Sequence, residues 1–229
     1  MITDKLVPNI EKRMSAWSSI QERLSKEQPP KPRLAVTISR EYGCEGYPLA
    51  ETLKTLLEVK TGDLWTVFDK TLIERVSNDA ALSERFLSNL GDASKPVDDI
   101  FGTLMPHWTT HTDAYRLLAR QVIALARQGN AIIVGRGGAV LTQRLSNCFH
   151  FRLVAPLEYR IKSIHERLNI PFEEARTLVI EHQRAREKFL ESFLNRSIAD
   201  PYYYHCVFNS TKSTTPIIAR SILNLIFEP

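Results

Sequence analysis

The first part of the chain carries apolar residues at the spacing of a single helix face. They recur every three or four positions, at Leu6, Ile10, Met14, Trp17, Ile20 and Leu24. This period predicts an amphipathic helix, and Pro29, Pro30 and Pro32 then predict a short stiff linker. We therefore expect an N-terminal helical arm with a Pro-rich linker over residues 1–33 and one domain over 34–229. The apolar stripe has to be buried, either on that domain or in a dimer or partner contact, and both alternatives stay open.

After residue 33 the pattern changes to short apolar runs that alternate with helical stretches. The predicted strands are 34–38, 65–68, 131–134, 149–154 and 206–208. The predicted helices are 49–58, 71–76, 115–127, 157–168, 172–194 and 216–227. Strands that alternate with helices are typical of parallel β-α-β units, so we expect an α/β fold with helices on both faces of the sheet.

The loop after the first predicted strand has the features of an anion site. It contains Gly43 and Gly46 and leads directly into a helix, whose first backbone N–H groups can hold a phosphate. The strict phosphate-loop motif ends in lysine and a hydroxyl residue, whereas Tyr47 and Pro48 stand there in this chain. A tight turn without a ligand is the alternative interpretation.

Composition limits the classes of protein. The chain has 229 residues, 43% of them hydrophobic and 24% charged, which is typical of a globular protein. Its apolar runs are far shorter than the roughly 20 residues of a membrane span, and three widely spaced cysteines form neither a disulfide framework nor a metal motif. We expect a cytoplasmic protein that does not bind membranes. The net charge of +4 does not point to nucleic acid, but would suit a small anion if the cations converge.

Four ordered motifs resemble the cytidylate kinase-like family, a branch of the P-loop nucleoside monophosphate kinases. They are I-S-R-E-Y-G at 38–43 followed by Gly46, V-G-R-G at 134–137, A-P-L-E-Y-R-I at 155–161, and D-P-Y-Y-Y at 200–204 followed by Asn209. The resemblance covers about residues 33–226. It implies a P-loop kinase-like fold with a five-stranded parallel sheet, a site for Mg²⁺-ATP at the first loop, an acceptor region in the insert that follows, and an arginine-bearing lid.

The resemblance also implies roles for individual residues. Catalytic charge neutralisation falls to Arg136, Arg184 and Arg186. Cofactor binding falls to Gly43, Cys44, Glu45, Gly46, Tyr47 and Asn209. Binding of the acceptor, first of all a nucleoside monophosphate such as CMP, falls to Arg40, Asp69, Arg75 and Arg160. The sequence identifies no metal ligand.

This chain lacks two features with which the family supports Mg²⁺-ATP. Members usually carry an arginine where Tyr47 stands, and true cytidylate kinases carry an acid just after the third strand, where this chain has Val134 and Gly137. Glu45 adds negative charge beside the expected triphosphate. A nucleotide-binding regulatory module without turnover is therefore the second hypothesis.

Overall fold

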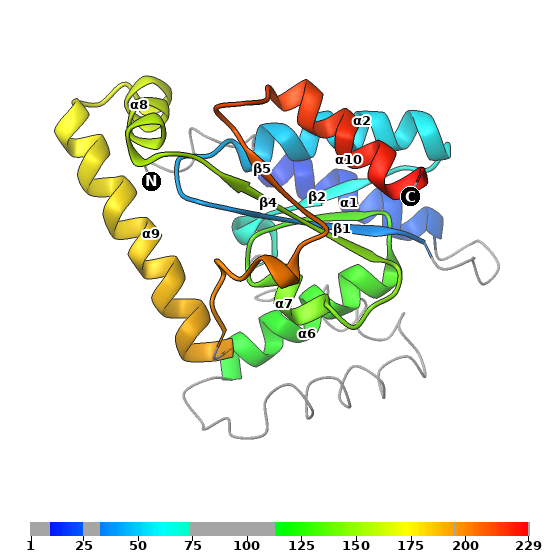
Figure 1. The fold of residues 1–229 in the computed structure, drawn as a ribbon. Helices are drawn as coiled ribbons and strands as arrows, with labels where there is room; N and C mark the ends of the chain where they lie inside the picture. The colour runs from blue at the N-terminus through cyan, green and yellow to red at the C-terminus, as the bar shows by residue number, and fades with distance from the viewer. Residues whose placement is uncertain (1–9, 25–32, 74–112, 195, 229) are drawn as a thin grey trace.

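The computed structural model describes residues 10–24, 33–73, 113–194 and 196–228. Five parallel strands form one sheet in the order β2-β3-β1-β4-β5 (Figure 1). Their bounds are β1 (Ala35–Arg40), β2 (Thr66–Phe68), β3 (Ala131–Val134), β4 (Cys148–Val154) and β5 (Cys206–Asn209). The five-stranded parallel sheet expected from the sequence is confirmed.

Helices connect these strands. They are α1 (Ile10–Leu24), α2 (Gly46–Thr61), α6 (Asp113–Gln128), α7 (Gly138–Thr142), α8 (Leu157–Leu168), α9 (Phe172–Leu194) and α10 (Thr215–Phe227), together with a 3₁₀ turn η4 (Pro201–Tyr203). Neither α7 nor η4 was expected. The helix predicted at 71–76 begins at Lys70 and is described to Ile73. None of the described helices combines the length and the apolar character that crossing a bilayer demands.

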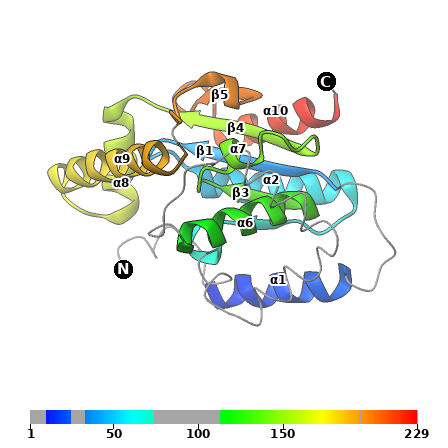
Figure 2. The ribbon, with the colours of Figure 1, turned by 90° about the horizontal axis from the view of Figure 1, so that it is seen from below.

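The sheet separates two apolar cores. Helices α2 and α10 contribute Leu53, Leu57 and Ile222 to the core on one face. Helices α1, α6 and α7 cover the other face, where Ile123 and Leu141 are buried. Figure 2 shows α6 and α1 on the side of the sheet opposite α10. Helices on both faces, as predicted, leave the carboxyl ends of the strands as the edge where a ligand can bind.

The middle of the apolar stripe of the N-terminal arm is buried on this domain. Met14 and Trp17 of α1 are buried, and the Trp17 ring meets Phe68 of β2 edge-on, with 5.9 Å between ring centroids. This agrees with the first of the two alternatives for the stripe. Leu6 lies outside the described residues.

Helices α8 and α9 form a separate arm beside the sheet (Figure 1). Asn169 ends α8 in the left-handed conformation, and Pro171 directly precedes α9. A third apolar cluster joins the two helices and includes Tyr42 from the loop after β1. Helices α8 and α9 therefore pack directly on that loop.

Candidate phosphate-binding site

The loop after β1 is a tight turn that delivers the chain into α2. The N–H groups of Cys44 and Gly46 donate within the loop, to the carbonyls of Glu41 and Cys44. Helix α2 begins at Gly46, and its N-cap Glu45 makes no side-chain cap bond in the described part of the chain. The positive end of the helix dipole is thus available to an anion, although two of the loop's amides already have partners.

Arg40, the last residue of β1, lies across the start of α2. A Cβ added to Gly46 would lie 3.1 Å from Arg40 Cδ, and one added to Gly135 would collide with Arg40 Nη1. The side chain therefore runs over the N-terminus of α2 and brings its guanidinium to the loop after β3. Both glycines leave space that this arginine occupies.

Arg136 lies in that second loop, between β3 and α7. Its φ of 57° is left-handed, as are those of Gly135 and Gly137 on either side. A left-handed arginine costs about 1–2 kcal/mol, and backbone strain of this kind is often found at functional sites. The loop is closed by the Gly138 N–H, which donates to the Gly135 carbonyl at 2.9 Å.

Arg186 reaches the same place from α9, with Tyr42 as its support. Its Nη1 donates to the Arg40 carbonyl at 3.4 Å, and its Cζ lies 4.9 Å from the centre of the Tyr42 ring. His182, one turn earlier, stacks on that ring at 4.6 Å. Gln183 Oε1 accepts the Tyr42 backbone N–H at 2.8 Å. Three side chains of α9 therefore hold Tyr42, and through it the helix is fixed to the loop.

The three guanidiniums lie within electrostatic range of one another. Burial lowers the pKa of Arg40 to about 10; Asp69 opposes this shift and Arg136 adds to it. Burial also lowers the pKa of Arg186, and the charges of Arg40 and Arg136 lower it further. Like charges in a poorly hydrated place repel, and a bound anion would relieve the repulsion. We call Arg40, Arg136 and Arg186 the arginine cluster.

Asp69, at the end of β2, is the acid that acts on this cluster, and it is already paired. Its Oδ1 accepts from Arg13 Nη2 of α1 at 2.8 Å and from the Leu72 N–H at 2.9 Å. The side chains of both Arg13 and Asp69 are 10% exposed. Arg13 also donates to the Val67 carbonyl at 3.4 Å and lies 5.0 Å from the Tyr47 ring centre. The N-terminal helix thus reaches the residue that sequence analysis assigned to the acceptor.

Arg160 is buried and braces the loop. Its Nε donates to the Ala155 carbonyl at 3.0 Å and lies 3.5 Å from Glu41 Oε2, while its Nη1 donates to the Tyr42 carbonyl. The Cβ that Gly43 lacks would lie 2.6 Å from Arg160 Cβ. These contacts explain Arg160 as a structural residue of the loop, and they do not bring it into the arginine cluster.

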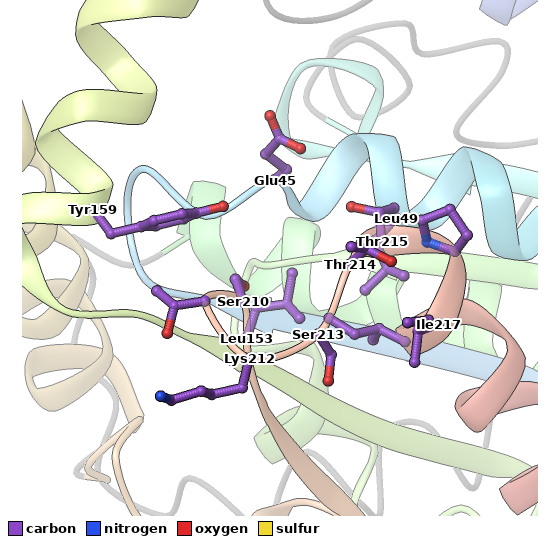
Figure 3. Close-up of a pocket in the computed structure, with 13 residues that line it drawn as sticks. Glu45, Leu49, Leu153, Tyr159, Ser210, Lys212, Ser213, Thr214, Thr215 and Ile217 are labelled. Atoms are coloured by element: carbon purple, nitrogen blue, oxygen red, sulfur yellow. The ribbon is translucent and has the colours of Figure 1, made fainter.

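A cavity of about 470 Å³ opens beside the loop, at the carboxyl end of β4. Glu45 and Leu49 from the start of α2, Tyr159 from α8 and residues 210–218 line it. Figure 3 shows Tyr159 and Glu45 on one side of it and the turn before α10 on the other. Asn209 shapes this turn, because its Oδ1 accepts from both the N–H and the hydroxyl of Thr211. The cavity has the size of small-ligand pockets.

The other predicted site residues lie in different surroundings. Arg184 is exposed on α9, two positions before Arg186 and so on another side of the helix. Burial raises the pKa of the Cys44 thiol to about 11, which leaves no reactive thiolate at neutral pH. Burial also raises the pKa of Tyr47. Arg75 lies outside the described residues.

Sequence reasoning missed Arg13, Gln183, Tyr159 and the residues 213–218 of the cavity wall. The position of Arg13 could have been predicted from its spacing, because it stands three positions after Ile10 and four before Trp17 and so falls on the apolar stripe. Tyr159 lay inside a quoted motif without a role. The described residues contain no group of three or more His, Cys, Asp or Glu that could hold a metal ion.

Comparisons with known proteins found a family and structures of similar fold. A family model described as the cytidylate kinase-like family matches residues 35–212. Among solved structures, an uncharacterized protein from Eubacterium ventriosum matches with a TM-score of 0.66 and 17% identity, over 86% of this chain and 99% of that one. A shikimate kinase from Bacteroides thetaiotaomicron matches with a TM-score of 0.47 and 11% identity, over 86% and 99%. No curated protein matches the chain.

Proposed function

Because the chain belongs to the cytidylate kinase-like family, we propose that it transfers the γ-phosphoryl group of Mg²⁺-ATP to a small acceptor, with CMP the first candidate among nucleoside monophosphates. The observation that carries the proposal is that Arg40, which crosses the start of α2, lies within electrostatic range of Arg136 and Arg186. Phosphoryl transfer needs positioning and positive charge more than covalent chemistry, and this cluster offers both.

The proposed binding mode places the nucleotide across the carboxyl edge of the sheet. The base enters the cavity between Tyr159 and residues 210–218, and the phosphates extend toward the start of α2. Arg40 substitutes for the lysine that the loop lacks, because its side chain already crosses that helix end. Arg136 and Arg186 face the transferring group from the β3–α7 loop and from the lid. Mg²⁺ arrives with ATP as part of the substrate.

A nucleotide-binding module without turnover is the second candidate. It is favoured by the loop itself, in which Tyr47 occupies the lysine position and two amide groups are used in the turn. Such a protein would bind ATP through the same cavity and cluster. It would form no product.

A turnover assay read by mass spectrometry separates the two. Purified protein is incubated with Mg²⁺-ATP and CMP, dCMP, UMP, AMP or GMP, beside an Arg136→Ala variant and an Arg220→Ala control, which changes an exposed arginine on α10. We expect a nucleoside diphosphate product from the parent protein and from the Arg220→Ala control, and at least a hundredfold less from Arg136→Ala. ATP binding without product from folded protein on any acceptor would refute the kinase proposal and favour the regulatory module.

A further inference from the structure

The N-terminal helix contributes one buried charge to the neighbourhood of the arginine cluster. Met14 and Trp17 fix α1 to the domain, and Arg13, directly before Met14 and four positions before Trp17, lies on the same side of the helix. Arg13 Nη2 pairs with Asp69 at 2.8 Å. The matched family region begins at residue 35, so this charge comes from outside the part of the chain that the family model covers.

The ion pair between Arg13 and Asp69 leaves other polar atoms of Arg13 unpaired within the described part of the chain, so it is a poor source of stability. Arg13 Nε and Nη1 are buried and have no hydrogen-bond partner among the described residues. Each buried donor left without a partner costs about 1–3 kcal/mol, and a buried ion pair is often no more stabilising than apolar residues of the same size. An arginine at this position therefore calls for a reason other than the stability of α1.

The reason for an arginine at position 13 lies in the effect of Asp69 on Arg40. The Asp69 carboxylate is buried, and its charge acts on the Arg40 guanidinium. A buried carboxylate without a partner is strongly destabilising, so it would draw in the cation that it already attracts. Arg40 would then neutralise Asp69 instead of an incoming phosphate.

We propose that Arg13 is a positioning residue that keeps Asp69 occupied, so that Asp69 does not compete with phosphate for Arg40. The inference rests on the proposed function and gives the N-terminal helix a part in it. Arg13 itself does not touch the nucleotide. Its role is to set how much positive charge the phosphate site keeps.

The test is a set of four proteins: the parent, Arg13→Met, Asp69→Asn and the double variant. Inorganic pyrophosphate is the probe, and its affinity is measured by calorimetry at one fixed salt concentration. We expect Arg13→Met to bind about tenfold more weakly, the size of one lost charge-assisted hydrogen bond. We expect the double variant to bind within about threefold of the parent, because the carboxylate that competes for Arg40 is gone.

Two results would overturn the inference. One is an Arg13→Met protein that binds pyrophosphate as well as the parent or better, which would make α1 neutral or inhibitory. The other is a double variant that stays as weak as Arg13→Met, which would mean that α1 had simply detached. If Arg13→Met does not fold, Arg13→Gln and its Asp69→Asn double variant carry the same comparison. A parent protein that binds no pyrophosphate would refute the arginine cluster as an anion site, and with it the proposed function.

Discussion

Replacing Tyr42 by leucine should release Arg186 from the proposed phosphate site without changing a charge. Tyr42 is 7% exposed, and its ring contacts both the Arg186 guanidinium and the His182 ring. A desolvated cation–π contact is worth about 2 kcal/mol, and an aromatic pair adds about 0.5–1.5 kcal/mol. Leucine keeps the backbone N–H bond to Gln183 and recovers part of the packing. The free energy that holds this part of α9 on the loop after β1 should therefore fall by about 2 kcal/mol, which is roughly a 30-fold change in the docking equilibrium.

The assay combines two measurements. Hydrogen exchange of the backbone amides near Arg186 reports docking of α9 without any ligand, and calorimetry with pyrophosphate reports the anion site. Tyr42→Leu should exchange faster and bind more weakly, whereas Tyr42→Phe, which keeps the ring, should match the parent. In a double-mutant cycle with Arg186→Met, the two losses should not add, because both remove the same contact. Additive losses, or a Tyr42→Phe protein as impaired as Tyr42→Leu, would refute the reasoning.

Three further predictions follow from contacts and pKa values. Gly135→Ala and Gly62→Ala both force alanine into the left-handed region, which should lower the free energy of unfolding by about 1 kcal/mol each. The added Cβ at position 135 would displace Arg40, so Gly135→Ala should also weaken pyrophosphate binding at least tenfold. The added Cβ at position 62 meets nothing within 4 Å, so Gly62→Ala should leave pyrophosphate affinity unchanged in the same calorimetric measurement. Burial lowers the pKa of His150 from 6.5 to about 4, so between these pH values the unfolded chain binds the extra proton. The free energy of unfolding should therefore fall by about 3 kcal/mol as the pH drops through that window, and urea titrations of His150→Gln should show a flatter dependence. Glu45→Gln should raise ATP affinity a few-fold in calorimetry at low salt, and less in 0.5 M salt, because a carboxylate at the cavity edge repels the phosphates; unchanged affinity at low salt would contradict this.

The fold was largely predictable because its signals are local. The bounds of α8 and α9 match the predicted ranges, since apolar periodicity and Pro171 mark them within a few residues. Helix α7 was missed because five residues are too few to show the apolar period of a helix, and because all five are buried and so show no polar face. Tertiary packing decides such a short helix, and no sequence window contains that packing.

The site was predictable in its residue types but not in its pairings. Arg40, Arg136 and Arg186 were all candidates, and the structure brings them together. Arg160 was a candidate on equal grounds, yet it braces the loop against Glu41, more than a hundred positions earlier in the chain. Which arginine joins the cluster and which pairs with a carboxylate depends on contacts between distant segments, and the pattern along the chain does not record them.

The strand order has a consequence for how the protein is made. The central strand β1 pairs with β3 and β4, and Thr37 of β1 lies opposite His150, 113 residues later. At a synthesis rate of 5–20 residues per second, β1 leaves the ribosome about 6–23 s before β4 exists to cover it. Residues 35–39 of β1 are buried on both faces of the strand in the finished protein, and Val36 and Ile38 make one of these faces apolar. This strand is therefore the segment of the nascent chain that most needs protection from aggregation, and folding should be limited by the arrival of β4.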